Sequence, residues 1–235
     1  MIDVATGRRQ AGTLAFDVAV LTGLCVAFFA GVAIIVASAP LALARFVGTT
    51  NPLVAAATVA LLLLAVSGPF LREGAFRVAG RPLGLYPALA LAALFGAIIV
   101  GADAVIRFPP DMNVPFPQSL AFYPAMGFAV EALFHVLPLA AIAALTRGGS
   151  GRSFFAWPAI LAVALIEPTY QTAVGFADGY PAAVTVFVYA QVAAINVAEL
   201  VLFRRYGFLA MLTLRWGYYA IWHIGWGAAR LTLLF

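Results

Sequence analysis

Glu131 and His135 are two ionisable side chains inside a long apolar stretch of this 235-residue chain, and they open the search for chemistry. Residues 120–145 contain no other charged side chain. The two residues are four positions apart, so on a helix they lie one above the other on the same face. An isolated charge in hydrocarbon costs several kcal/mol, so this face must meet a partner, a bound ion or a water-filled cavity. The pair therefore predicts a polar site within a membrane.

A second pair with the same spacing occurs further along the chain. Glu167 and Gln171 are again four residues apart, and Pro168 lies between them. Proline has no backbone N–H, so a carbonyl about one turn earlier should lack its helical partner. A carboxylate beside an interrupted helical turn is a common way to build a polar pocket in a membrane.

The last apolar segment supplies the cation and the second histidine. Arg215, Tyr219, His223 and Gly227 follow one another at intervals of four. Arg215 is the only arginine predicted to lie well inside a span, and its guanidinium stays charged wherever it is. A carboxylate is its natural partner, because arginine makes paired hydrogen bonds to one. We expect Glu131 in this role, with Glu167 as the alternative.

Counting along the helices indicates that these groups share one layer. At 1.5 Å per residue from the arginine-rich loops, Glu131, Glu167 and Tyr219 lie about 20 Å along their helices. The segment before the last adds Asn196, and also Glu199 near an end where Arg204 and Arg205 could neutralise it. We predict that Glu131, His135, Glu167 and His223 converge in one cavity open to water, lined by Gln171, Asn196, Arg215 and Tyr219. A simpler alternative stays open, in which Glu131 and Arg215 form only a structural ion pair.

The composition indicates the elements that must position these residues. The chain is 65% hydrophobic and only 9% charged, whereas soluble domains have about a quarter charged residues. We therefore expect an all-α, polytopic transmembrane bundle: a cytoplasmic tail at 1–14 and one transmembrane domain at 15–235. Seven spans are predicted, near residues 16–38, 52–71, 84–106, 119–146, 153–176, 182–203 and 206–233. Turns are expected between them, including a basic one at 147–152 and another at 176–181.

The arginines predict the orientation. All 13 basic residues are arginine, and the net charge is +4. With seven spans, nine loop and tail arginines fall on the N-terminal side, whereas only Arg45, Arg107 and Arg230 fall on the other. The positive-inside rule then places the N-terminus in the cytoplasm and the C-terminus outside, in a bacterial inner membrane. This role explains the positive charge without a nucleic-acid partner, and the lipid bilayer is the expected surrounding.

Residues 119–230 resemble the core of the CPBP family, the CAAX-processing and bacteriocin-processing intramembrane proteases. That family has a Glu-Glu-x-x-x-Arg motif, which here falls on Val130, Glu131 and His135 and keeps only its second glutamate. A Phe-x-x-x-His motif would fall near Glu167 and Gln171, with neither residue kept. A later His-x-x-x-Asn motif falls on His223 and Gly227 and keeps only its histidine. The run 203–209 is similar to the turn before the family's last core helix.

The resemblance implies a divergent intramembrane endopeptidase. Glu131 would be the general base or a ligand, His135 and His223 would be ligands or oxyanion stabilisers, and Glu167 a second carboxylate. The substrate would be a membrane-embedded or prenylated peptide. Whether a metal takes part is a separate question: the two histidines with Glu131, and Glu167 as a fourth, could form a zinc-type ligand set.

Two further functions stay open, because several family residues are replaced. One is an inactive pseudoprotease that serves as a membrane scaffold or immunity factor. The other is a small proton-coupled transporter that uses Glu131 and Glu167, in line with the usual role of intramembrane carboxylates.

Overall fold

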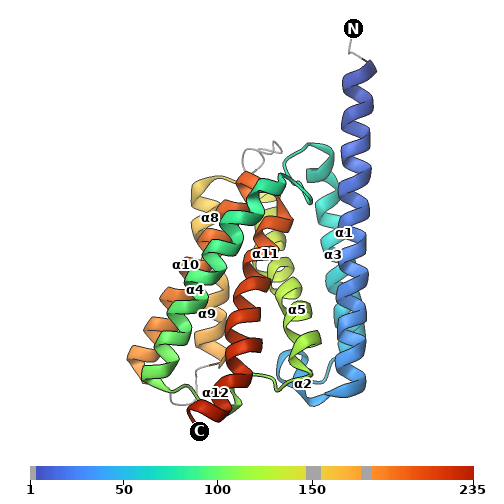
Figure 1. The fold of residues 1–235 in the computed structure, drawn as a ribbon. Coiled ribbons are helices and arrows are strands. Elements are labelled where there is room, and N and C mark those ends of the chain that lie inside the picture. Colours follow the sequence, from blue (N-terminus) through green and yellow to red (C-terminus); the bar gives the residue numbers. More distant parts are fainter. Residues whose placement is uncertain (1–3, 147–154, 176–180) are drawn as a thin grey trace.

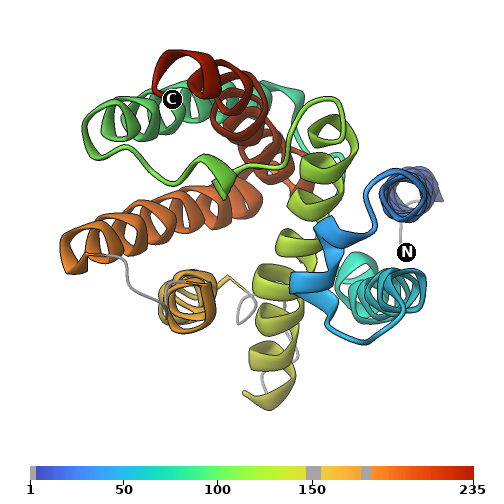
Figure 2. The same ribbon diagram turned by 90° about the horizontal axis from the view of Figure 1, so that it is seen from below.

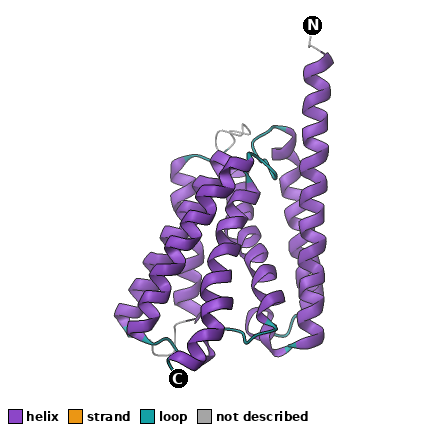
Figure 3. Ribbon diagram, in the orientation of Figure 1, coloured by secondary structure: helices purple, strands orange, loops and turns teal. Residues whose placement is uncertain are grey.

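The computed structural model describes residues 4–146, 155–175 and 181–235, and throughout these ranges its regular structure is helical (Figure 3). This confirms the predicted all-α class. The expected basic turn at 147–152, and all but the last residue of the turn at 176–181, lie outside the described residues. The α-helices are α1 (Val4–Ser38), α2 (Leu41–Val47), α3 (Pro52–Arg72), α4 (Leu85–Ile106), α5 (Ser119–Val130), α6 (Leu137–Leu145), α8 (Trp157–Ala164), α9 (Ile166–Tyr170), α10 (Ala182–Tyr206), α11 (Phe208–Tyr219) and α12 (Gly227–Leu233).

Among the described residues, five helical stretches are long and apolar enough to cross a membrane: Gly12–Ser38, Pro52–Arg72, Pro82–Ile106, Ser119–Leu145 and Ala182–Tyr206. They agree with five of the predicted spans. The other two predicted spans, 153–176 and 206–233, correspond to the interrupted helical runs α8–α9 and α11–α12. A lipid bilayer is thus the natural environment of the bundle, and the total of seven spans stays a prediction.

The first helix is longer than the sequence predicts. α1 begins at Val4, so most of the expected tail at 1–14 is helical and continues into the first candidate span. In Figure 1 this end of α1 extends past the other helices. The start of α3 is as predicted, because Pro52 occupies its first turn and the Asn51 side chain accepts hydrogen bonds from the amides of Leu53 and Val54.

The helices form two groups joined by α5. α1 and α3 lie side by side on one flank, and α4, α10 and α11 lie on the other (Figures 1 and 2). α11 packs closely on α4 because small residues occur at the crossing: a Cβ added to Gly217 would be 2.8 Å from the Cβ of Ala92. The segment Ala220–Trp226 that follows α11 is also close to α4, since a Cβ at Gly96 would be 2.7 Å from Ile221. This places α11 in contact with α4, α5 and α10, where its polar side chains face the interior.

Candidate functional site

Arg215 is the centre of a buried polar cluster formed by α11, α10, α9 and the helix that contains Glu131. Its Nε donates to Glu131 Oε1 at 2.9 Å. Its Nη1 and Nη2 donate to the two oxygens of Glu167 at 3.2 and 2.9 Å. Arg215 is 2% exposed and both glutamates are 1% exposed or less. The expected partner and the alternative partner are therefore both engaged.

α10 adds two more acceptors to the same guanidinium. Nη2 of Arg215 is 3.0 Å from Asn196 Oδ1 and 2.7 Å from Glu199 Oε2. The expectation that Glu199 pairs with Arg204 and Arg205 is wrong, because its side chain is fully buried and faces Arg215. Glu199 follows Asn196 by three residues, so both side chains lie on one face of α10. This spacing was the feature of the sequence that indicated the position of Glu199.

Glu131 and His135 form a hydrogen-bonded dyad. His135 Nδ1 is 2.5 Å from Glu131 Oε2, and neither residue is exposed. When Nδ1–H donates to the carboxylate, Nε2 carries the lone pair of the neutral imidazole. Glu131 thus contacts Arg215 through one oxygen and orients His135 through the other.

The dyad lies on a widened helical turn. Residues Glu131–Val136 are π-helical between α5 and α6. Pro138 follows at once and cannot donate to the carbonyl of Phe134, which accounts for the loss of regular pairing here. Two more π-helical segments, Gln171–Gly175 and Ala220–Trp226, contain Gln171 and His223. Such segments are frequent at functional sites.

The interruption at Pro168 has the predicted consequence. The carbonyl four residues earlier belongs to Ala164, and it accepts a hydrogen bond from Asn196 Nδ2 at 3.0 Å. Gln171 Nε2 donates to Glu167 Oε1 at 2.9 Å, which confirms the second pair. The free carbonyl fixes Asn196, whose other amide atom then contacts Arg215.

The cluster has more negative than positive groups and leaves two buried atoms unpaired. Glu131, Glu167 and Glu199 face one guanidinium. Within the part of the chain that the structure describes, His135 Nε2 and Glu199 Oε1 have no hydrogen-bond partner. Buried polar atoms are nearly always paired, so each of these atoms indicates a place for a water molecule, a proton or a ligand.

A divalent metal fits this arrangement poorly. Glu131, His135 and Glu199 each offer a ligand atom, all within 4.8 Å of one another. Both oxygens of Glu131 are nevertheless engaged by Arg215 and His135. Only two donor atoms are then open, next to a guanidinium, whereas a zinc site needs three or four ligands. The expected ligand His223 is not part of this group of described residues.

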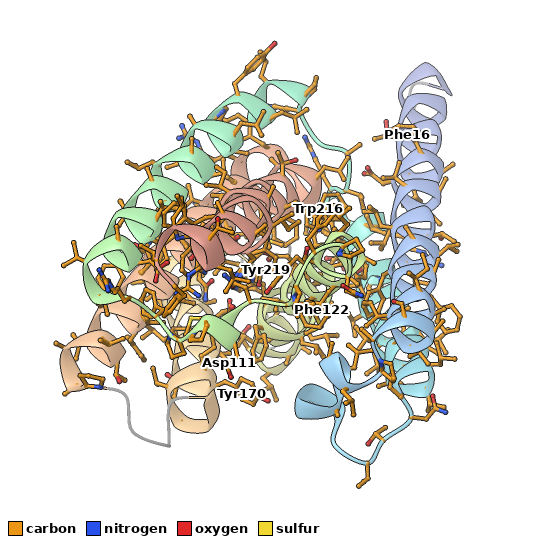
Figure 4. The ribbon with its side chains drawn as sticks, turned by 60° about the horizontal axis from the view of Figure 1, so that its bottom comes forward. Phe16, Asp111, Phe122, Tyr170, Trp216 and Tyr219 are labelled. Atoms are coloured by element: carbon orange, nitrogen blue, oxygen red, sulfur yellow. The ribbon has the colours of Figure 1, made fainter. Side chains whose placement is uncertain are left out.

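His223 contacts Tyr219 and residues outside the cluster. Its Nδ1 is 2.7 Å from Asn113 Oδ1, and its ring stacks on Tyr123 with centroids 4.4 Å apart. The ring of Tyr219 connects the two regions, because it is 5.7 Å from the Arg215 guanidinium carbon and 4.9 Å from the His223 ring. Figure 4 shows Tyr219 in the interior of the bundle. The participation of His223 in the site stays a prediction.

A second buried arginine was not expected. Arg230 was predicted on the external side of the membrane, and in the structure it is fully buried in α12, where its Nε donates to Asp103 Oδ2 at 2.7 Å. Its Nη2 donates to the other oxygen at 2.8 Å. Trp226 also donates to Asp103, and the carbonyls of Phe108 and Pro109 accept from Arg230. The single acid in the predicted span 84–106 was the signal for this pair.

Comparisons with known proteins identify neither a family nor a function for this chain. Neither family models, nor curated proteins, nor solved structures match the chain. The resemblance to the CPBP proteases therefore stays a prediction, which rests on Glu131 and His223.

Proposed function

We propose that this protein is a membrane-embedded hydrolase, a divergent relative of the CPBP proteases that cleaves a peptide bond within the bilayer. The observation that carries the proposal is the Glu131–His135 dyad, in which the carboxylate holds Nδ1 at 2.5 Å and Nε2 is left without a partner. A carboxylate that orients an imidazole in this way produces a general base.

In the proposed reaction, a water molecule donates its hydrogen bond to His135 Nε2. The imidazole takes the proton as the water oxygen adds to the substrate carbonyl carbon, and Glu131 stabilises the imidazolium that forms. The same proton then passes to the amide nitrogen as the C–N bond breaks, which leaves a carboxyl and an amine. The unpaired Oε1 of Glu199 is a second acceptor that could orient the water.

The remaining cluster residues act as positioning groups. Glu167 and Asn196 hold the guanidinium of Arg215, and Arg215 in turn holds Glu131. An apolar cavity of about 340 Å³ touches the dyad's helix at Val130, Leu133 and Phe134. It offers a place for the apolar side chains of a membrane-embedded or prenylated peptide.

Profiling of protein N-termini in bacterial membranes tests this function. Membranes that contain the wild-type protein should yield new N-termini from membrane proteins, and Glu131→Gln or His135→Gln should abolish them. Asp111→Asn is the matched control, because it neutralises an exposed carboxylate in the short 3-10 helix Pro110–Met112, outside the cluster. Identical N-termini for the wild type and both dyad variants would exclude hydrolysis by the dyad.

Proton-coupled transport is a second candidate, favoured by the excess of carboxylates. Three buried carboxylates against one guanidinium should retain at least one proton, because an unbalanced charge in the membrane is costly. Proteoliposomes loaded with a pH-sensitive dye would show proton uptake that Glu199→Gln abolishes. Folded protein with neither cleavage nor uptake would favour the inactive scaffold.

We also propose seven spans in the bacterial inner membrane, with a cytoplasmic N-terminus. The support is the distribution of arginines across the loops. Reporter fusions at Gly149 should report a cytoplasmic position and fusions at Asp111 an external one. The reverse pattern would invert the proposed orientation.

A further inference from the structure

A second polar region lies at the end of the bundle where α10 ends and α11 begins. A cavity of about 710 Å³ is lined by Arg77 and Arg81 from the loop after α3, and by Arg204 and Arg205 from the last turn of α10. Glu73 is the only carboxylate among the described lining residues. Four guanidinium groups against one carboxylate leave this cavity with a strong positive charge.

Backbone hydrogen bonds, not the arginine side chains, hold the two walls together. The amide of Arg81 donates to the carbonyl of Tyr206 at 2.8 Å, and the amide of Phe208 donates to the carbonyl of Arg77 at 2.8 Å. Gly80 permits this approach: its φ is +56°, and a Cβ there would be 1.6 Å from the Tyr206 oxygen. The guanidinium groups therefore stay near one another despite their repulsion.

The position and the chemistry of the cavity indicate its ligand. It lies where the candidate spans Pro52–Arg72 and Ala182–Tyr206 end, which is the level of lipid headgroups in a bilayer. Guanidinium groups form paired, charge-assisted hydrogen bonds with phosphate oxygens. Basic pockets between helices on the cytoplasmic side bind anionic headgroups.

We propose that this cavity binds a phosphate ester anion, as carried by the headgroup of an anionic phospholipid. Arg77 and Arg81 contact the phosphate from one wall and Arg205 from the other. Arg204 also lies over the Trp157 ring, 5.3 Å from its centroid, so part of its contact is with α8. The site is separate from the buried cluster and does not depend on the hydrolase proposal.

Lipid titration of the full-length protein in an uncharged detergent tests the proposal. Phosphatidylglycerol, phosphatidylcholine and inorganic phosphate are added, and binding is followed by native mass spectrometry and by the shift in melting temperature. Arg77→Gln and Arg205→Gln should each weaken phosphatidylglycerol binding about fivefold, which corresponds to about 1 kcal/mol per basic residue. Arg72→Gln is the matched control, because Arg72 is exposed at the end of α3 but does not line the cavity.

The outcomes separate the two sources of phosphate. Phosphatidylglycerol binding that inorganic phosphate does not displace supports a lipid ligand, whereas displacement by inorganic phosphate supports a soluble phosphate compound at the same site. Equal affinity for phosphatidylglycerol and phosphatidylcholine would overturn the proposal. Equal losses in Arg72→Gln and Arg77→Gln would overturn it as well, since the effect would then be general surface charge.

Discussion

The two buried arginines show how an ion pair that secures a fold differs from one that marks a site. Arg230 faces a single carboxylate, Asp103, and both oxygens of that carboxylate are paired. Arg215 faces three carboxylates, and its cluster contains the unpaired atoms Nε2 of His135 and Oε1 of Glu199. The Arg230 pair is neutral and its carboxylate is fully hydrogen-bonded. The Arg215 cluster has surplus negative charge and buried atoms without a hydrogen-bond partner.

This difference bears on function, because the chain buries Arg230 with a single neutralising carboxylate. Burial of an arginine therefore does not by itself require three. Burial of two extra carboxylates beside Arg215 adds a cost that a single pair would avoid. The helices that carry Glu131 and Glu167 are also irregular near these residues, at Glu131–Val136 and at Leu165, while Asp103 lies in the regular helix α4. Surplus charge on irregular helices is the combination expected of a working site.

Removal of Arg215 should have the largest effect on the protein. Arg215→Ala leaves Glu131, Glu167 and Glu199 without their cation. The free energy of unfolding should therefore fall by an amount near the upper end of about 3–5 kcal/mol. Titration with SDS in mixed micelles measures it. Adding Glu131→Gln should recover only part of the loss, because two carboxylates remain. Full recovery would mean that Glu131 alone carries the coupling.

The sequence predicted that Glu131 or Glu167 pairs with Arg215, because charge in a membrane restricts where a side chain can lie. Glu131 and Arg215 had few possible partners, and the carbonyl freed by Pro168 follows from the chemistry of proline alone. Depth along a helix was less informative. Glu199 and Arg230 lie near helix ends. A small rotation of the helix about its axis decides there whether a side chain is exposed or buried, and a uniformly apolar sequence does not specify that rotation.

The position of His223 shows how an irregular helical turn changes a predicted row of residues. The row of residues at intervals of four from Arg215 assumes a regular α-helix. It holds to Tyr219, whose ring meets the guanidinium, but residues Ala220–Trp226 are π-helical. A wider turn rotates everything after it, so His223 meets Asn113 instead. The last apolar segment contains no proline, so the sequence does not indicate its π-helical part.

Disruption of the Arg230–Asp103 pair should have a smaller effect, which a second substitution should largely compensate. Arg230→Gln leaves Asp103 charged and without its cation, with only the hydrogen bonds from Trp226 and the Phe108 amide. The free energy of unfolding should therefore fall by an amount near the lower end of about 3–5 kcal/mol. Adding Asp103→Asn removes the remaining charge, so the double variant should recover to within about 1 kcal/mol of the wild type. The same SDS titration applies. A double variant no more stable than Arg230→Gln would contradict the description of a neutral, fully hydrogen-bonded pair.

Neutralisation of single carboxylates should separate members of the Arg215 cluster. Glu131→Gln loses charge-assisted hydrogen bonds to both Arg215 and His135, each worth about 1.5–3 kcal/mol. Glu199→Gln weakens one charge-assisted hydrogen bond to Arg215 but also removes surplus charge, so the two effects should offset and the free energy of unfolding should change by less than about 1 kcal/mol. The two variants are matched in chemistry and differ only in position. Equal destabilisation would show that the cluster has no surplus charge.

The smallest effect is expected from one methyl group at the contact between α5 and α11. A Cβ at Gly127 would be 3.0 Å from Trp216 Cδ1 and 3.2 Å from Arg215 Cγ. The indole cannot move freely, because its Nε1 donates to the carbonyl of Pro124 at 3.0 Å. Gly127→Ala should therefore displace Arg215 by a few tenths of an ångström and reduce the free energy of unfolding by about 1 kcal/mol.

Gly101→Ala is the control for this substitution, since a Cβ there has no neighbour within 4 Å. Both changes add the same group to a helix, so any difference between them reports on the contact at Arg215. The proposed hydrolysis adds a second measurement. A shift of Arg215 moves Glu131 and, through it, the imidazole of His135, so Gly127→Ala should slow cleavage more than its small loss of stability explains. Unchanged cleavage in a destabilised Gly127→Ala protein would mean that the dyad does not depend on the position of Arg215.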